Sequence, residues 1–272
     1  TPGKLIAHLQ MGYVNFADLE YLVLDEADRM LDIGFHEDIM KIMTYIPKKR
    51  QTLMFSATMA PEIRKLAANI LNSPKELNME IAKPPEGVLQ AVYLAHDEQK
   101  IPLIRDLIAD KPDCKSVLIF SSTKAKVAQI VRALKGNDYV VAGISSDLKQ
   151  SDREEVLSKF RARQIRVLVA TDVMSRGIDI KDINLIINFD APQDAEDYVH
   201  RVGRTARAET TGIALTLINR DDMYRLVRIE KLIGKEVIKI PLPAELGEAP
   251  IWDPKSSGGK KRYGKTFRKK KR

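Results

Sequence analysis

Residues 22–28 read Leu-Val-Leu-Asp-Glu-Ala-Asp, a short apolar run that ends in acidic residues. In open α/β sheets, ligands bind beyond the carboxyl ends of the strands. Asp25 and Glu26 therefore stand where nucleotide enzymes need a magnesium-holding aspartate and a water-orienting glutamate. Because an Asp-Glu-Ala-Asp string also occurs on solvated helices, the string alone leaves a plain surface helix open.

Apolar strand-like runs alternate with helical patterns on both sides of this stretch, which predicts βαβ units and an α/β fold built on parallel sheets. The predicted strands are Tyr21–Leu24, Thr52–Phe55, Leu89–Leu94, Val117–Phe120, Tyr139–Val141, Arg166–Ala170, Leu185–Ile187 and Ile213–Leu217. The predicted helices are Phe35–Ile46, Gln99–Ala109, Lys124–Leu134, Gln150–Phe160 and Met223–Ile233.

Residues 82–87 contain two prolines and a glycine, which cannot continue a helix or a central strand. We therefore predict a linker at 82–87 between residues 1–81 and a second domain at 88–241. Residues 1–81 are short for an α/β domain, whereas residues 88–241 have the predicted strands of a complete one.

The net charge of +8 is concentrated at the carboxyl end. Residues 255–272 carry ten Lys or Arg and no acid, and the remaining residues carry 35 basic and 37 acidic side chains. We predict that residues 242–272 form a basic disordered tail that binds polyanions such as RNA. A solubilising charge run is the alternative reading.

Composition excludes several classes of protein. Cys114 is the one cysteine, so we expect neither a disulfide framework nor a thiolate metal site. No apolar run approaches the roughly 18 residues that span a bilayer, and we recognise no signal peptide. These features predict an intracellular, cytoplasmic protein.

Further polar strings follow other predicted strands. Ser56-Ala57-Thr58 follows the second strand, and Thr171-Asp172 follows a later one. Residues 176–179 read Arg-Gly-Ile-Asp, and residues 200–207 read His-Arg-Val-Gly-Arg-Thr-Ala-Arg. Two planar guanidiniums three residues apart, beside a glycine, suit bidentate recognition of phosphate. By itself, this arginine cluster could equally be a surface ion-pair face.

In this order the strings resemble the DEAD-box RNA helicases, and the resemblance runs from Thr1 to about Pro241. Ser145-Ser146-Asp147 and Met174-Ser175-Arg176 look most similar to the bacterial RhlE-like branch. The resemblance implies two RecA-like lobes, the first truncated at its N-terminus, with ATP and Mg²⁺ as cofactors and RNA as the partner.

The resemblance also implies roles for individual residues. Asp25 would hold magnesium through water, Glu26 would help to activate the attacking water, and Arg204 and Arg207 would be arginine fingers worth about 10³–10⁵ in rate. The nucleotide contacts would be Gly177 and Asp179. The residues that link nucleotide state to lobe closure would be Asp28, Ser56, Thr58 and His200. The RNA contacts, to phosphate and sugar and so with little sequence preference, would be Thr1, Gly3, Gln150, Arg153 and Thr171.

The family's phosphate-binding loop is expected upstream of Thr1. Residues 259–266 fit the spacing G-x-x-x-x-G-K-[ST] letter for letter. A phosphate loop needs an apolar strand before it and a helix after it, and the sequence predicts neither here. We therefore interpret this match as chance and expect the chain alone to lack full ATPase activity.

Three functions stay open at this point. The first is an ATP-dependent RNA helicase. The second is a non-catalytic RNA-binding fragment that acts through the second lobe and the basic tail. The third, favoured less by residues 25–28 and 200–207, is a DNA-directed helicase of the same superfamily.

Overall fold

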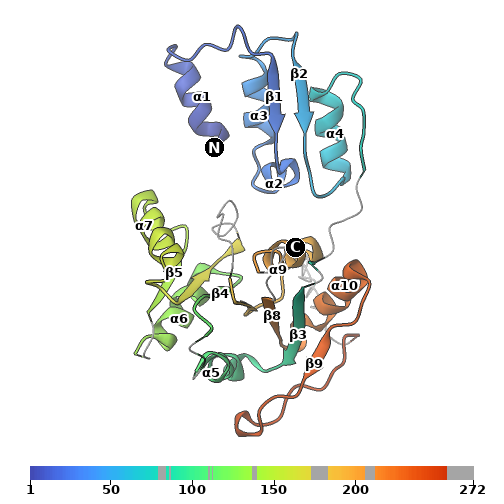
Figure 1. Cartoon of the computed structure of the whole chain (residues 1–272). Helices are drawn as coiled ribbons and strands as arrows, with labels where there is room; N and C mark the ends of the chain where they lie inside the picture. Colours follow the sequence, from blue (N-terminus) through green and yellow to red (C-terminus); the bar gives the residue numbers. More distant parts are fainter. Residues whose placement is uncertain are drawn as a thin grey trace, which may run out of the picture. The chain divides into compact units, whose positions relative to one another are not determined.

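A computed structural model describes residues 1–78, 84–85, 87–109, 111, 113–136, 140–172, 183–205 and 212–255 (Figure 1). The chain divides into two compact units, Thr1–Ile81 and Ala82–Arg272. Each unit is described by itself below. Within the described ranges, no helix is both long enough and apolar enough to cross a membrane.

The first unit contains a two-stranded parallel sheet, in which Tyr21 pairs with Gln51 and Leu24 with Met54. Leu24, Ile39, Leu66 and Ile70 are its buried centre, so α3 and α4 pack against the sheet through aliphatic side chains. Its elements are α1 (Pro2–Gln10), β1 (Tyr21–Leu24), α2 (Ala27–Asp32), α3 (His36–Met43), β2 (Gln51–Met54) and α4 (Pro61–Ile70).

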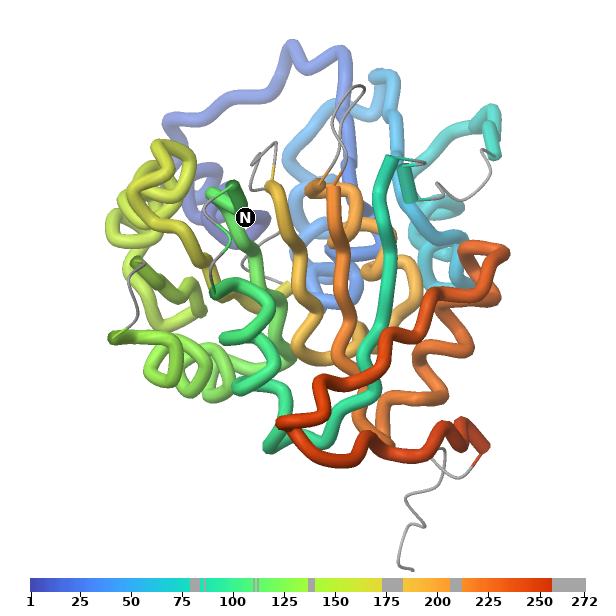
Figure 2. The backbone as a smooth tube through the Cα atoms, turned by 60° about the horizontal axis from the view of Figure 1, so that its bottom comes forward, coloured from blue at the N-terminus to red at the C-terminus, as the bar shows by residue number. Residues whose placement is uncertain are grey.

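The second unit contains a seven-stranded sheet in the order β5-β6-β4-β7-β8-β3-β9, and all its described strand pairs are parallel (Figure 2). Its strands are β3 (Val88–Leu94), β4 (Val117–Phe120), β5 (Val141–Ile144), β6 (Val167–Ala170), β7 (Leu185–Asn188), β8 (Gly212–Ile218) and β9 (Ile238–Ile240). Its helices are α5 (Asp97–Ile108), α6 (Lys124–Leu134), α7 (Gln150–Arg161), α9 (Ala195–Val202) and α10 (Met223–Ile233), with short 3₁₀ turns η1 (Arg220–Asp222) and η2 (Ala244–Leu246).

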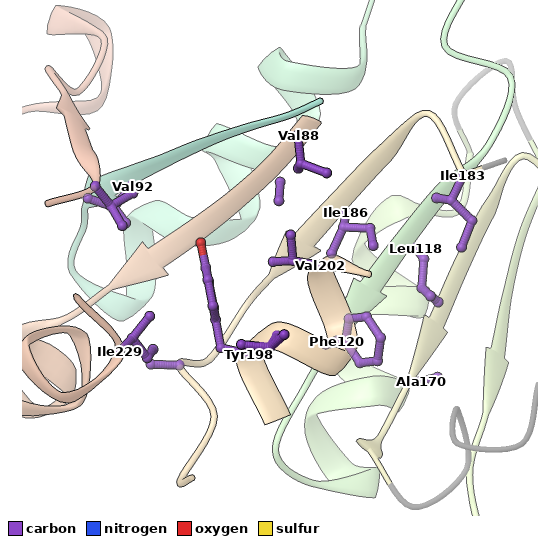
Figure 3. Packing of buried hydrophobic residues seen from close by; sticks show 14 of the residues in the cluster. Val88, Val92, Leu118, Phe120, Ala170, Ile183, Ile186, Tyr198, Val202 and Ile229 are labelled. Atoms are coloured by element: carbon purple, nitrogen blue, oxygen red, sulfur yellow. The ribbon is translucent and has the colours of Figure 1, made fainter. Parts of the chain in front are cut away.

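Helices cover both faces of this sheet. Strands β4 and β6 are apolar throughout, and alternate residues of β4 enter different clusters, because successive side chains point to opposite faces. One cluster includes residues of α5 and α6, and the other includes residues of α7, α9 and α10. Figure 3 shows the second cluster, in which Tyr198 of α9 is fully buried and donates its hydroxyl hydrogen to Gln90 Oε1 at 3.1 Å.

The prediction of an α/β fold with parallel sheets is confirmed. Helices α6 and α10 have the predicted bounds, whereas α1, α2, α4, α9 and β9 were not predicted. The strand predicted at Tyr139–Val141 is wrong in position, because β5 runs from Val141 to Ile144 and Tyr139 lies outside the described residues. Gly143, a residue type that weakens strands, lies inside β5 beneath α6.

The predicted start of the tail at residue 242 is also wrong. Leu242 and Leu246 pack against one core cluster and Trp252 against the other. Residues 242–255 therefore belong to the second unit. The sequence did not predict this packing, because the segment contains prolines and has no apolar periodicity. Of the predicted disordered tail, residues 256–272 lie outside the described ranges.

Candidate nucleotide and RNA site

The acidic string begins where β1 ends. Asp25 and Glu26 are exposed, and Asp25 Oδ1 accepts a hydrogen bond from the Glu26 N–H at 2.9 Å. Glu26 has a positive φ of 51°, a conformation that is costly for a residue with a side chain and that clusters at functional sites. Its carboxylate bonds Arg29 at 2.9 Å across the first turn of α2.

Hydrogen bonds tie this string to the loop that follows β2. The Asp28 N–H donates to Ser56 Oγ at 3.2 Å, and the Thr58 N–H donates to Asp28 Oδ2 at 3.0 Å. Because β1 and β2 are parallel neighbours, their carboxyl ends meet at one edge. The structure therefore brings together Asp28, Ser56 and Thr58, three of the four residues predicted to couple nucleotide state to movement.

The site fits a magnesium ion held mainly through water. Among the described residues, no group of three His, Cys, Asp or Glu side chains could enclose a metal ion. Magnesium keeps several waters and needs only one or two carboxylates, so the exposed carboxylate of Asp25 is a suitable ligand.

Thr1 and Gly3 lie at the start of α1. Thr1 is exposed, and its carbonyl accepts the Leu5 N–H at 3.2 Å. A Cβ added at Gly3 would lie 3.9 Å from Asp38 Oδ2 of α3, which is an ordinary contact distance. Gly3 is therefore exposed backbone beside a carboxylate, and nothing in the packing of the first unit requires a glycine there.

In the second unit, a buried arginine connects two of the polar strings. Arg201 of α9 donates from Nε and Nη2 to the two carboxylate oxygens of Asp172, at 2.6 and 2.7 Å. Its Nη1 donates to Asn188 Oδ1 at 3.0 Å and to the Asp190 carbonyl at 2.9 Å. The guanidinium also lies 5.0 Å from the centre of the Phe120 ring. Arg201 thus fixes α9 to the ends of β4, β6 and β7.

The Asp190 side chain lies in a second buried network. Its Oδ1 accepts a hydrogen bond from Lys126 Nζ at 2.6 Å and lies 3.8 Å from Lys100 Nζ. Its Oδ2 accepts a hydrogen bond from the Ser122 N–H at 2.9 Å. Burial favours a higher pKa for Asp190, but the bonds from Lys126 and Ser122 and the charge of Lys100 outweigh it and hold the pKa below its ordinary value. Asp190 therefore stays ionised and fixes the loop after β4.

The remaining predicted residues of the second unit lie on three elements. Gln150 and Arg153 are in the first turn of α7, where Gln150 Nε2 donates to Glu154 at 2.7 Å. Thr171 directly follows β6 and is half-buried. His200 is exposed near the end of α9, and Arg204 is half-buried two residues beyond α9.

Some predicted positions cannot be placed. Gly177, Asp179 and Arg207 lie outside the described residues, as do residues 259–266 of the phosphate-loop-like match. The arrangement of the two predicted arginine fingers is therefore described for Arg204 only.

Sequence reasoning missed Arg201, Asn188 and Asp190 as parts of the site. Arg201 is inside the string at 200–207, but the prediction concerned the two later arginines of that string. Arg201 is only 3% exposed, and an arginine so deeply buried requires a partner. The apolar helix face that contains it (Tyr198, Val199, Val202) was the available signal.

Comparison with known proteins agrees with this geometry. Residues 1–66 match the DEAD/DEAH box helicase family, and residues 99–209 match the helicase conserved C-terminal domain. The DEAD-box ATP-dependent RNA helicase CshA of Geobacillus kaustophilus is 39% identical over 250 residues, which cover 92% of this chain and 53% of that protein.

Two solved structures are also similar. S. cerevisiae Dbp5 bound to RNA and ADP BeF3 has a TM-score of 0.79 and 28% identity, and the match covers 89% of this chain and 64% of that one. E. coli DEAD-box protein SrmB bound to regulator of ribonuclease activity A has a TM-score of 0.52 and 31% identity, and the match covers 60% of this chain and 98% of that one.

The parallel-sheet fold, with acidic and hydroxyl residues directly after its strands, places the chain among the α/β proteins that bind ligands beyond the carboxyl ends of their strands. The chain belongs to the DEAD-box RNA helicase family. It spans about half the length of the curated relatives, with 53% of one CshA and 48% of another. The resemblance to the RhlE-like branch stays a prediction.

Proposed function

We propose that this chain carries most of the motor of an ATP-dependent RNA helicase, in which ATP hydrolysis drives local unwinding or remodelling of RNA duplexes. Residues 1–81 would belong to the first RecA-like lobe, and the second lobe would begin near residue 88. The observation that carries the proposal is the hydrogen-bonded junction in which Asp28 contacts both Ser56 and Thr58. Such a junction can transmit a change at the phosphate site to the neighbouring loop.

In this proposal, Asp25 would hold Mg²⁺ through water, and the bound ion would supply positive charge beside the phosphates. Glu26, the next residue along the chain, orients the attacking water and receives its proton. Arg204 and Arg207 stabilise the charge that develops on the transferred phosphoryl group, and Gly177 and Asp179 contact the nucleotide.

RNA would bind through its phosphates and sugars. The exposed start of α1 supplies Thr1 and Gly3, and the second unit supplies Gln150, Arg153 and Thr171. The relative Dbp5 was solved with RNA and ADP BeF3, which supports RNA and ATP as ligands of this chain as well. The basic residues from Lys255 onward would add affinity that is independent of RNA sequence.

A non-catalytic RNA-binding role is the second candidate. The second unit has an extensive sheet of its own. The phosphate-loop spacing at residues 259–266 stands among basic residues, without the apolar strand that a phosphate-binding loop follows. We therefore propose that the 272 residues bind RNA but do not hydrolyse ATP without a further phosphate-binding segment.

The test measures ATP hydrolysis and RNA binding by the 272-residue chain, with RNA and with DNA of the same sequence. We expect salt-dependent RNA binding and no turnover with either nucleic acid. RNA-stimulated turnover would overturn the non-catalytic role and our interpretation of residues 259–266. Stronger stimulation by DNA would favour a DNA-directed helicase instead.

A further inference from the structure

The connection between β4 and α6 has the strand, turn and helix order of a phosphate-binding loop. Strand β4 is fully buried, residues 121–124 read Ser-Ser-Thr-Lys, and α6 begins at Lys124 with Thr123 as its N-cap. The start of a helix presents N–H groups and a partial positive charge, both of which suit an anion. We call residues 121–123 the β4 turn.

A carboxylate of the chain itself occupies the anion position beside the β4 turn. Asp190 lies two residues beyond β7 and is 3% exposed. Its Oδ1 accepts a hydrogen bond from Lys126 Nζ at 2.6 Å, and its Oδ2 accepts one from the Ser122 N–H at 2.9 Å. Ser121 Oγ donates to the same Oδ2 at 3.4 Å. A backbone N–H, a hydroxyl and an ammonium group therefore converge on one negative charge.

Lys100 adds a second ammonium group, which this carboxylate does not satisfy. The Lys100 side chain is fully buried, and its Nζ lies 3.8 Å from Asp190 Oδ1, beyond hydrogen-bond distance. The Nζ also lies 3.1 Å from Asp97 Oδ1, but it makes no well-directed hydrogen bond to any residue that the structure describes. Buried donors are almost always satisfied. An anion with more oxygens than a carboxylate, bound in place of the Asp190 side chain, would supply the acceptor.

Four neighbouring strands bring these groups together. Strands β4, β7, β8 and β3 are adjacent and parallel, so their carboxyl ends meet at one edge, where α/β sheets bind ligands. The Nζ atoms of Lys100 and Lys126 lie 5.2 and 5.8 Å from the centre of the Phe189 ring. The Lys126 side chain is 36% exposed, which gives solvent access to the group of donors.

The balance of charge depends on Asp190. Two lysines, Lys100 and Lys126, face two carboxylates, Asp97 and Asp190, so their charges sum to zero. Without the Asp190 carboxylate, the same group would carry one net positive charge. The nearby carboxyl group of Asp222 is paired with Arg225 at 2.7 Å. Loss of the Asp190 carboxylate would therefore leave a partly buried group of donors that favours an anion.

We propose that the β4 turn, Lys100 and Lys126 form a binding site for a tetrahedral oxyanion, which the folded protein closes with its own Asp190 carboxylate. In the wild type, the carboxylate holds the donors, and inorganic phosphate does not bind there. Removal of the side chain opens the site to phosphate, whose additional oxygens can accept from Lys100. The β4 turn therefore does not replace a phosphate-binding segment for ATP. The inference goes beyond the proposed helicase activity and does not depend on it.

Two substitutions of Asp190 separate the loss of charge from the opening of the site. Asp190→Ala removes the carboxylate and leaves room for an anion between Lys126 and Ser122. Asp190→Asn removes the same charge, but its amide fills the same space, so it is the matched control. Phosphate also stabilises proteins in general, by exclusion from their surface, and this general effect acts on both variants.

The experiment follows thermal unfolding of the 272-residue chain at pH 7, in inorganic phosphate and in chloride of equal ionic strength. At about ten times its Kd, phosphate should raise the Tm of Asp190→Ala by about 3–6 °C more than the Tm of Asp190→Asn or of the wild type. Equilibrium dialysis with radiolabelled phosphate should show one more phosphate bound per chain by Asp190→Ala than by Asp190→Asn.

A second substitution in the Asp190→Ala chain locates the bound phosphate. Lys126→Met should weaken phosphate binding about 10- to 100-fold, because a charged donor is lost. Lys124→Met is the control for this change. Lys124 is 61% exposed and pairs with Asp147, so its replacement should leave phosphate binding unchanged.

Three results would overturn the inference. The first is an equal response of Asp190→Ala and Asp190→Asn to phosphate, and the second is phosphate binding that Lys126→Met does not weaken. The third is equal binding by the wild type, because Asp190 would then not close the site. If Asp190→Ala is unfolded in chloride, circular dichroism measures its refolding in phosphate. Recovery by Asp190→Ala but not by Asp190→Asn is then expected, and no recovery would overturn the inference.

Discussion

Arg201 connects α9 to the carboxyl ends of β4, β6 and β7. Replacing it by lysine keeps the charge but removes the planar fork that bonds both oxygens of Asp172 and two further acceptors. We expect Arg201→Lys to lower the free energy of unfolding of the second unit by about 2–4 kcal/mol, since buried acceptors lose their donors. Urea denaturation measures the change.

Arg228→Lys is the matched control for this prediction. Arg228 is 55% exposed and lies 3.9 Å from the exposed Asp194, so its ion pair contributes little. Its replacement should change stability by less than about 0.5 kcal/mol. Equal effects at the two positions would show that the buried network of Arg201 does not stabilise the unit.

Asp190 gives a pH-dependent prediction. Its pKa is lowered in the folded protein, so the ionised form stabilises the fold above the unfolded pKa of about 3.9, and this contribution is lost as the pH falls through the lower folded pKa. Asp190→Asn should therefore destabilise the chain at pH 7 and progressively less on approach to pH 3. Denaturation at several pH values measures this.

Two other carboxyl groups of the second unit, those of Asp97 and Asp222, also make the stability depend on pH. The pKa of Asp97 is also lowered, although burial opposes the shift, whereas burial raises that of Asp222 and gives it the opposite slope. The contribution of Asp190 is the part of the pH dependence of stability that Asp190→Asn removes. The control is Asp147→Asn, at an exposed carboxylate paired with Lys124. A destabilisation by Asp190→Asn that does not change with pH would contradict the assignment.

At the residue scale, contacts between residues that directly follow neighbouring strands were predicted better than contacts that depend on helix packing. The family resemblance implied a shared role for Asp28 and Ser56, each of which comes shortly after an apolar run, and the two residues are hydrogen-bonded. The contact of Arg201 with Asp172 depends on how α9 packs across the sheet, which no local pattern specifies. The motif strings and the family resemblance therefore identified the acids and hydroxyls but not the arginine that positions Asp172.

Helix α6 and strand β5 illustrate the element scale. A Cβ at Gly143 would lie 3.0 Å from both Val127 Cγ1 and Val131 Cγ2 of α6, closer than ordinary contact. We expect Gly143→Ala to push the helix from the strand and to cost about 1–3 kcal/mol, measured by thermal or urea unfolding. Adding Val131→Ala should recover part of the stability. A double variant no more stable than Gly143→Ala would contradict this packing explanation.

Periodicity and capping account for the elements that were predicted correctly. Helix α6 begins after Thr123, whose hydroxyl accepts the Lys126 N–H at 3.2 Å, and buries Val127, Ile130 and Leu134 along one face. By contrast, β9 is three residues long and largely exposed, so it lacks the apolar run that marks a strand. Its pairing with β3 is a tertiary effect.

At the scale of the whole molecule, residues 255–272 differ from the rest of the chain in charge, because they carry ten Lys or Arg and no acid. Affinity for RNA should fall steeply with salt, and removal of residues 256–272 should reduce the slope by about 0.7 for each phosphate that these residues neutralise. Titration of a short single-stranded RNA over a KCl series measures this. A slope unchanged by the deletion would show that these basic residues do not bind RNA.

In the proposed function, Glu26 activates the water that attacks ATP once a phosphate-binding segment is present. The most direct measurement is RNA-stimulated ATP hydrolysis by the 272-residue chain joined behind a helicase phosphate-binding segment, with and without Glu26→Gln. We predict turnover that needs RNA and that Glu26→Gln abolishes while ATP still binds. Turnover that survives Glu26→Gln would show that Glu26 does not activate the attacking water.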